Sequence, residues 1–289
     1  MVLALDFRQT MRAFCALLTV CLLIPLAIAN DDPDAASVEY LTSISNTKYH
    51  LHKSESLSHD YHVYVLAPEE SESQDKYATV YLLDGGITFP LLAAYSRYLS
   101  LANEIPPLIL VGISYGTDDF RLGNRRSTDF TAPAENRDHY GGAAAFQSML
   151  FTELFPLIEQ NYPSDPSQRI LFGQSIGGQF SIYNAMTKPD KFLGMIASNP
   201  ALHRNLDFFL APKVDERKVK RKSRLFVSTA AYDDDRFKVP ANKWLDHWQA
   251  IEGKPFILET HQLENENHFS AAPTAFKNGL KWIFADQPE

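Results

Sequence analysis

Ser175 is the side chain best suited to nucleophilic chemistry, because it lies in the segment 173–178, which reads GQSIGG. The segment follows an apolar run over 169–172 and precedes a helical pattern over 178–187. G-x-S-x-G at such a strand–turn–helix junction is typical of a nucleophile elbow. In so tight a turn, we expect a Cβ at Gly173 or Gly177 to clash, and the helix N-terminus to favour developing negative charge. The pattern predicts a nucleophilic serine, and the alternative is a structural Gly-Ser turn.

The general base for Ser175 is expected among the histidines, because a serine hydroxyl is a poor nucleophile without a base in hydrogen-bond reach. In α/β-hydrolases the base follows the nucleophile in the chain, which leaves His203, His247, His261 and His268. His203 precedes the sixth predicted strand, His247 lies in a helical pattern and His261 extends a predicted strand. His268 lies in a loop before the last predicted helix, where such sheets place active sites. We predict His268 as the base, and the alternative is a solvated loop histidine.

A triad acid would hold the imidazole in one tautomer and stabilise its charged form. The sixth predicted strand leads into three consecutive aspartates, and Asp233 is the first of them. Three adjacent carboxylates cannot all face one histidine, so we predict Asp233 as the acid. A solvated acidic loop is the ordinary interpretation of such a run. The sequence also leaves open, in this order, Asp235, Asp234, and the loop residues Glu264 and Glu266.

Acyl transfer also needs backbone N–H donors for the tetrahedral oxyanion. One donor is predicted at Ile176, the residue after the nucleophile, and the other at Gly86 in the segment 83–87, after an early strand. A flexible turn is the alternative at 83–87. No histidine or carboxylate cluster has metal-ligand spacing, so we expect neither a metal nor an organic cofactor.

The candidate catalytic residues lie far apart in the sequence, so strands and helices must bring them together. The hydrophobic residues of the chain follow two patterns, one typical of strands and one typical of helices. Strand-like runs alternate with helical patterns, which predicts a single α/β domain with a mostly parallel sheet and helices on both faces. The predicted strands cover 62–66, 78–83, 108–113, 169–172, 194–197, 224–228 and 255–259. The predicted helices cover 145–162, 178–187, 242–251 and 274–284.

The first thirty residues have the pattern of a secretory signal peptide. The uncharged apolar stretch 13–29 follows Arg8 and Arg12 and ends in Ala27-Ile28-Ala29, a small-residue cleavage signature. Cleavage after Ala29 would leave a secreted or periplasmic domain over 30–289, without Cys15 and Cys21. The alternative is an N-terminal membrane anchor, for which the apolar run is short.

Composition narrows the possible partners. The chain has 289 residues, 45% hydrophobic and 21% charged, with a net charge of −8. That balance disfavours nucleic-acid binding, which needs clustered Lys and Arg. Two cysteines exclude a disulfide framework. We expect a small-molecule ester as the partner, no nucleic acid, and no stable membrane span after cleavage. The oligomeric state is left open.

Four segments carry a resemblance to a known family over about 62–284. The segment 80–85 is similar to a Y-L-L-D-G strand, 173–178 to a nucleophile elbow, and 199–202 (NPAL) to S-P-S-L with Asn and Ala in place of the serines. The segment 126–133 resembles R-x-x-D-[FY]-T-P with Ala132 inserted. The chain thus resembles the Putative esterase family of α/β-hydrolases, which includes esterase D-type and siderophore esterases.

The resemblance implies an α/β-hydrolase fold and a serine esterase. Ser175 would be the nucleophile and His268 the base, and Asp233 stands where the family usually has a glutamate. The implied function is a secreted serine hydrolase that cleaves carboxylic esters through an acyl-enzyme, with siderophore trilactones or small acyl or aryl esters as candidate substrates. The alternatives are an acyltransferase on the same scaffold and a non-catalytic, hydrolase-like binding protein.

Two further groups of side chains, one basic and one aromatic, have both a functional and a purely structural interpretation. The basic cluster in 213–222 could flank an anionic substrate, although such clusters are usually solvated. Aromatic side chains could line an acyl pocket or simply pack in the core; they are Tyr115, Phe120, Phe130 and Tyr140.

Overall fold

The computed structural model, described for residues 41–68, 76–135 and 137–285, contains one eight-stranded sheet. Its strand order is β1-β2-β4-β3-β5-β6-β7-β8, with β1 and β2 antiparallel to their neighbours and the rest parallel. The mostly parallel sheet is therefore as predicted. The strands are β1 Lys48–Ser54, β2 His59–Leu66, β3 Tyr77–Leu82, β4 Leu108–Ser114, β5 Ser164–Gln174, β6 Gly194–Ser198, β7 Ser223–Ala230 and β8 Phe256–Leu263.

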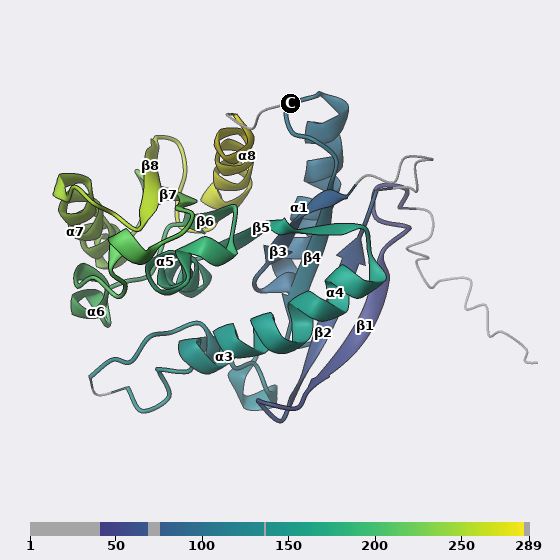
Figure 1. The fold of residues 1–289 in the computed structure, drawn as a ribbon, viewed down its shortest axis with the longest axis horizontal. Helices are drawn as coiled ribbons and strands as arrows, with labels where there is room; N and C mark the ends of the chain where they lie inside the picture. The colour runs from purple at the N-terminus through teal and green to yellow at the C-terminus, as the bar shows by residue number, and fades with distance from the viewer. Residues whose placement is uncertain (1–40, 69–75, 136, 286–289) are drawn as a thin grey trace, which may run out of the picture. The chain divides into compact units, whose positions relative to one another are not determined.

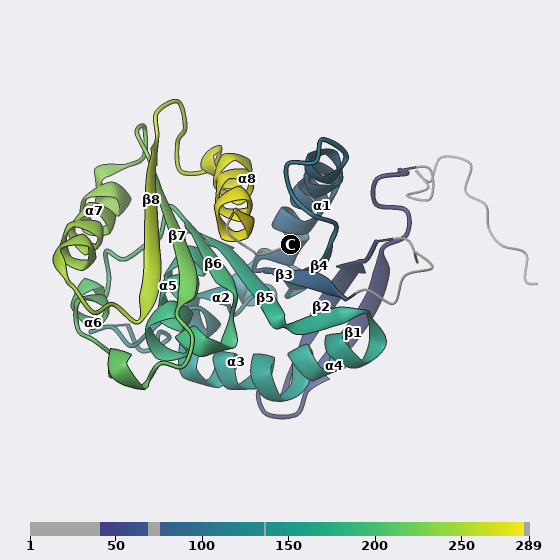
Figure 2. The same ribbon diagram turned by 45° about the horizontal axis from the view of Figure 1, so that its top comes forward.

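Helices cover both faces of this sheet (Figure 1 and Figure 2). α1 and α8 lie side by side on one face, while α3 to α6 lie on the other, and α7 packs beside α6 near β8. The α-helices are α1 Gly85–Leu101, α2 Arg126–Asp129, α3 Ala143–Met149, α4 Phe155–Asn161, α5 Ile176–Thr187, α6 Leu206–Leu210, α7 Asp235–Ala250 and α8 Ala271–Phe284. A π-helical turn, Leu150–Leu154, joins α3 to α4, and 3₁₀ turns lie at Phe120–Leu122, Pro189–Lys191 and Glu216–Lys218.

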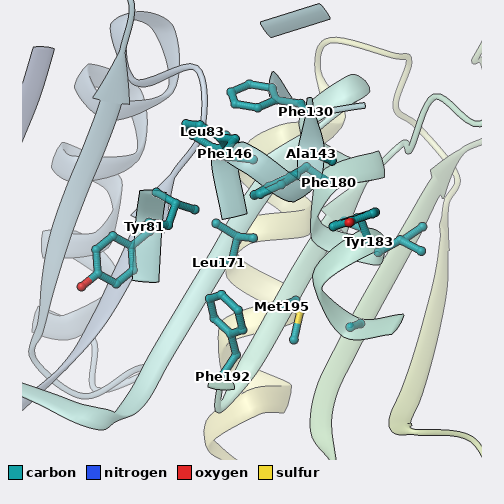
Figure 3. Packing of buried hydrophobic residues seen from close by; sticks show 14 of the residues in the cluster. Tyr81, Leu83, Phe130, Ala143, Phe146, Leu171, Phe180, Tyr183, Phe192 and Met195 are labelled. Carbon is teal, nitrogen blue, oxygen red and sulfur yellow. The ribbon is translucent and has the colours of Figure 1, made fainter. Parts of the chain in front are cut away.

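Alternation along the central strands creates two cores, because successive side chains of a strand point to opposite faces. Val80 and Leu82 pack with α1 and α8. Tyr81 and Leu83 pack with the helices of the opposite face. Figure 3 shows Leu83 beside Phe146, and the Tyr81 ring contacts Phe155 in α4 with 4.3 Å between centroids. β4 is buried along its whole length, as expected of a central parallel strand. These cores fix the strands whose ends carry the candidate site.

Several elements depart from the sequence-based prediction. β1 is absent from the predicted strands because, as an edge strand, it exposes Tyr49 and Leu51 and mixes polar with apolar residues. The segment 83–87 is predicted as a loop, but its residues from Gly85 onward form the start of α1, which Leu83 and Asp84 precede. Two glycines in the first turn and Pro90 inside the helix conceal α1 from pattern analysis, because both residue types disfavour helices. α7 likewise starts at Asp235, not at 242, and contains Pro240.

The parallel strands β5, β6, β7 and β8 bring their carboxyl ends to one edge of the sheet. Ser175, Asn199 and Asp233 follow β5, β6 and β7 at that edge, and His268 lies in the loop after β8. The basic cluster in 213–222 instead leads into the amino end of β7, so it does not flank this edge. Parallel strand direction is the reason, since the two ends of β7 lie on opposite edges of the sheet.

The predicted signal peptide, its cleavage site and both cysteines lie outside the described residues. Within residues 41–68, 76–135 and 137–285, none of the helices combines the length and apolar character needed to cross a membrane.

Candidate active site

Ser175 occupies the sharp turn between β5 and α5, with φ 57° and ψ −116°. Its backbone N–H donates to the Ser198 carbonyl at 2.9 Å, which anchors the turn on the end of β6. An ideal Cβ at Gly173 would lie 2.1 Å from the Gly177 carbonyl oxygen, so this position admits only glycine. The predicted clash at Gly177 is wrong, because a Cβ there would meet its nearest neighbour, in Leu83, at 3.5 Å. The strained turn is the local reason why the hydroxyl stands clear of the sheet.

The structure joins three sequence-predicted side chains into one hydrogen-bonded chain. His268 Nε2 lies 2.9 Å from Ser175 Oγ. His268 Nδ1 lies 2.9 Å from Asp233 Oδ2 and 3.1 Å from Oδ1. The imidazole side chain is 13% exposed and the carboxylate side chain 3% exposed, so water screens their interaction little. This is the geometry of a nucleophile, a base and an orienting acid.

The Asp233 carboxylate accepts further hydrogen bonds that hold it in place. The backbone N–H of Asp234 donates to Oδ1 at 2.7 Å. The side-chain amide of Asn199 donates to Oδ2 at 2.9 Å. A buried carboxylate needs such donors, because burying a charge without hydrogen bonds is costly. Sequence reasoning did not assign Asn199 a role, although its departure from the S-P-S-L segment was visible.

The other candidate acids have different partners. Asp234 caps α7 by accepting from the Arg236 N–H, and Asp235 pairs with Lys238 at 3.3 Å. The two loop glutamates accept hydrogen bonds from residues of their own neighbourhood. Gln262 donates to Glu264, and Thr274 donates to Glu266. Of the five acids considered, Asp233 is the one placed against the imidazole of His268.

The other histidines that follow Ser175 in the chain make packing or surface contacts. His203 meets the Phe237 ring edge-on, with 5.1 Å between centroids. His247 packs against Trp248 in α7, and His261 pairs with Glu259 on β8. None of these contacts involves Ser175.

The His268 loop is held by two residues that sequence reasoning missed. Phe237, in the first turn of α7, stacks on the imidazole with 4.2 Å between centroids and 22° between planes. Gln174, the last residue of β5, donates from Nε2 to the His268 carbonyl. Gln174 adjoins the nucleophile in the motif, but no spacing signal marks Phe237. Its role depends on how α7 folds back over the end of the sheet.

The two predicted oxyanion donors lie in the first turns of two helices that cover opposite faces of the sheet. Ile176 begins α5, and Gly86 is the second residue of α1. The first N–H groups of a helix lack acceptors within it, which leaves both free to bind an anion. The two turns are in contact, since a Cβ at Gly177 would lie 3.5 Å from Leu83 Cβ and 3.6 Å from Asp84 Oδ2. The structure therefore places both donor segments beside the serine elbow.

A pocket of about 680 Å³ opens over Ser175 and His268. Its apolar wall differs from the predicted aromatic set, which does not line it. Phe130 and Tyr115 are instead buried in the core, while Phe120 is 77% exposed. The apolar lining consists of Ile87, Tyr232, Phe237 and Phe269, and the polar lining includes Asp84, Asp118, Asn124, Arg126, Asp234, Arg236 and Asn267.

Arg126 and Asp84 form an ion pair in the pocket wall. Arg126 Nε and Nη2 donate to the two carboxylate oxygens at 2.8 and 2.9 Å, a bidentate pair. Burial opposes the guanidinium charge, but the Asp84 carboxylate and its hydrogen bonds raise the pKa of Arg126 above its usual value. The pair ties α2 to the start of α1, beside the predicted oxyanion donor Gly86.

The other charged residue of the 126–133 segment, Asp129, points into the core. It accepts hydrogen bonds from the hydroxyls of Tyr61 at 2.9 Å and Tyr115 at 3.1 Å. Burial raises the pKa of Asp129 above its usual range, although both tyrosine hydroxyls oppose the shift. This segment therefore supplies one residue to the pocket and one to the support behind it.

In the described part of the chain, no three or more His, Cys, Asp or Glu side chains are grouped to hold a metal ion. The chemistry that the arrangement itself supports is nucleophilic attack by Ser175, with proton transfer through His268.

The chain has clear similarity to known proteins. The family model described as "Putative esterase" matches residues 54–261. The ferri-bacillibactin esterase BesA of Bacillus subtilis is 25% identical over 269 residues, covering 86% of this chain and 92% of the relative. The siderophore triacetylfusarinine C esterase of Aspergillus fumigatus is 24% identical over 240 residues, covering 72% and 82%.

A solved structure has the same fold. The BES protein from Bacillus cereus superposes with a TM-score of 0.73 at 24% identity, covering 83% of this chain and 95% of that chain. Together with the strand order, this match confirms the predicted α/β-hydrolase fold.

Proposed function

The chain belongs to the Putative esterase family and is a carboxylic ester hydrolase, and on this basis we propose that it cleaves siderophore esters through a serine acyl-enzyme. The observation that carries the mechanism is the continuous contact from Ser175 Oγ to His268 Nε2, and from His268 Nδ1 to Asp233. Nucleophile, base and acid are thereby linked at hydrogen-bond distance, as this chemistry requires.

In the first half-reaction, Ser175 Oγ attacks the ester carbonyl while His268 Nε2 takes the hydroxyl proton. Asp233 stabilises the imidazolium that forms, and the N–H groups of Ile176 and Gly86 bind the oxyanion. Collapse of the tetrahedral intermediate breaks the ester C–O bond. The leaving alkoxide receives the proton from His268 and departs as an alcohol.

In the second half-reaction, water attacks the acyl-Ser175 carbonyl and gives its proton to His268. The resulting tetrahedral intermediate expels the serine oxygen, which recovers the proton from His268. The products are one carboxylic acid and one alcohol for each ester bond cleaved, and the enzyme returns to its starting state.

The proposed substrate class rests on the relatives and on the pocket. Two relatives are esterases of ferri-bacillibactin and of triacetylfusarinine C. The pocket holds about 680 Å³, enough for a sizeable ligand. Its rim carries two well-exposed aromatic rings, Tyr232 and Phe269, and its wall carries Arg126 and Arg236. The exposed aromatic faces suit flat iron-binding groups, whereas both guanidinium groups are paired within the wall, Arg126 with Asp84 and Arg236 with Asp234. The iron would enter as part of the substrate.

We further propose that residues 1–29 are removed on export and that the mature protein acts outside the cytosol. The support is the A-x-A signature after the apolar run. Mass determination of the N-terminus of protein recovered from its native compartment tests this proposal. A mature chain that starts at Asn30 is expected, and an intact Met1 would contradict cleavage.

The test of function is a hydrolysis assay with the purified protein. The substrates are ferric and iron-free catecholate trilactones, triacetylfusarinine C and p-nitrophenyl acetate, with acid and alcohol products identified by mass spectrometry. We expect a siderophore ester to be cleaved with a higher kcat/KM than p-nitrophenyl acetate. Ser175→Ala should lower kcat by more than about 10³-fold while the melting temperature is retained.

Three outcomes would contradict the proposal. Full activity in Ser175→Ala would exclude the serine mechanism. Cleavage of p-nitrophenyl acetate without any siderophore ester would exclude the substrate class. Ester products in place of acids when an alcohol is added would favour acyl transfer. A fluorophosphonate probe should label Ser175, and a non-catalytic binding protein would not react.

A further inference from the structure

Asn199 extends the hydrogen-bonded chain to a fourth residue. It follows β6, the strand that lies between β5 with Ser175 and β7 with Asp233. Its Nδ2 donates to Asp233 Oδ2 at 2.9 Å, and the residue is 2% exposed. Building on the serine mechanism proposed above, we propose that Asn199 is a positioning residue. It holds the Asp233 carboxylate in the orientation that accepts the hydrogen bond from His268 Nδ1.

The carboxylate of Asp233 needs such a restraint. The last torsion of an aspartate side chain is broad and roughly two-fold, so it imposes little orientation by itself. The Asp234 N–H fixes Oδ1 from one side, and Asn199 fixes Oδ2 from the neighbouring strand. With both donors present, the carboxylate is held in the orientation in which His268 Nδ1 lies 2.9 Å from Oδ2 and 3.1 Å from Oδ1. Without the amide, the carboxylate keeps one backbone donor and can rotate away from the imidazole.

The backbone of Asn199 suits this task. Its φ is 45°, in the left-handed region, which asparagine tolerates better than most side chains. Its N–H donates to the Ser228 carbonyl at 2.9 Å, so the backbone is attached to β7 itself. Asn199 and Asp233 therefore move with the same strand, and their distance is set by the sheet. An amide also reaches further than the hydroxyl of a serine, and it presents two donors.

Asn199 could act through Asp233 or only support the fold, and a double-mutant cycle distinguishes these two roles. If Asn199 acts through Asp233, removing its donor has no further effect once Asp233 is gone. If it only supports the fold, the loss is the same with and without Asp233. The rate at which a fluorophosphonate labels Ser175 can be measured in weak variants, so it serves as the readout alongside kcat and KM for p-nitrophenyl acetate.

Two variants remove the donor in different ways. Asn199→Gly adopts a positive φ without strain, and Asn199→Asp keeps the side-chain shape while replacing the donor with an acceptor. The matched control is Asn205→Ala. Asn205 is also a buried asparagine, and its Nδ2 donates to the Ala132 carbonyl at 2.9 Å, away from the catalytic chain. Melting temperatures of all variants report the cost to the fold.

We expect both Asn199 variants to lower kcat and the labelling rate about tenfold, the value of one charge-assisted hydrogen bond, with KM within about twofold. In the Asp233→Ala background, the same substitutions should change the labelling rate by less than about twofold. Asn205→Ala should lower the melting temperature and leave kcat unchanged.

Unchanged rates in folded Asn199→Gly or Asn199→Asp would overturn the positioning role, as would an equal loss in both backgrounds. These results leave the proposed serine mechanism intact. An unchanged labelling rate in Asp233→Ala would instead overturn the proposed triad, and the role of Asn199 with it.

Discussion

The imidazole of His268 lies flat against the ring of Phe237, with 4.2 Å between centroids and 22° between planes. Phe237 follows Asp233 by four residues and belongs to the first turn of α7. One short segment after β7 therefore supplies the carboxylate at the edge of the imidazole and an aromatic ring on its face. The guanidinium of Arg236 lies 4.4 Å from the same ring. The imidazole is thus restrained at its Nδ1 edge by Asp233 and on one face by Phe237.

Phe237→Leu should lower kcat about three- to tenfold, because the imidazolium that forms during catalysis loses its contact with a π-face. Phe237→Trp keeps an aromatic face and should retain most of the activity. Steady-state kinetics on p-nitrophenyl acetate measures both variants. Phe237 also lines the pocket, so the argument depends on kcat and not on KM. Equal kcat in the leucine and tryptophan variants would show that the aromatic face contributes nothing to catalysis.

Asp233→Asn should lower kcat by about 10²- to 10⁴-fold, because the amide cannot stabilise the imidazolium and favours the wrong tautomer. Asp235→Asn is the matched control. Asp235 pairs with Lys238 on the surface of α7, so its loss should leave kcat within about twofold. Comparable losses of kcat in the two variants would show that Asp233 has been wrongly chosen as the acid among the three consecutive aspartates.

Gly173→Ala should destabilise the protein by about 1–3 kcal/mol or more, because its Cβ would lie 2.1 Å from the Gly177 carbonyl oxygen. Gly177→Ala places its Cβ at ordinary contact distances of 3.5 Å and more, so a change below about 1 kcal/mol is expected. Urea unfolding of the two variants measures the difference. Equal destabilisation would mean that the elbow relaxes to accommodate a side chain.

Ionisation of the buried Asp129 carboxyl should lower the free energy of unfolding as pH rises. Burial raises the pKa of Asp129 in the folded protein, so the folded state holds a proton that the unfolded state has released. The contribution of this carboxyl is fully present below its unfolded pKa, near 4, and is lost as pH rises through the raised pKa. Asp129→Asn removes the titration. The free energy of unfolding of the wild type should fall relative to the variant from pH 4 upward, and parallel curves would contradict this account.

Much of the catalytic chain was predictable from the sequence. The GQSIGG segment marks Ser175 because the motif is typical of a tight turn between a strand and a helix, and the structure shows that this turn needs a glycine at 173. Chain order and loop position then select His268. The central strands were predictable as well, since runs such as 108–113 are apolar on both faces, as expected of a buried parallel strand. Local chemistry and hydrophobic periodicity suffice for these features.

The tertiary structure decided the rest. Sequence alone left five candidate acids, and the strand ends select Asp233 because its side chain meets His268 across 35 positions of the chain. Asn199 and Phe237 have no local signature, since each acts through a residue that only the sheet order or the packing of α7 brings near. α1 and β1 escaped detection for a related reason: tertiary packing overrides their weak local propensities. Side-chain direction and long-range proximity, which complete the site, arise only when the strands align.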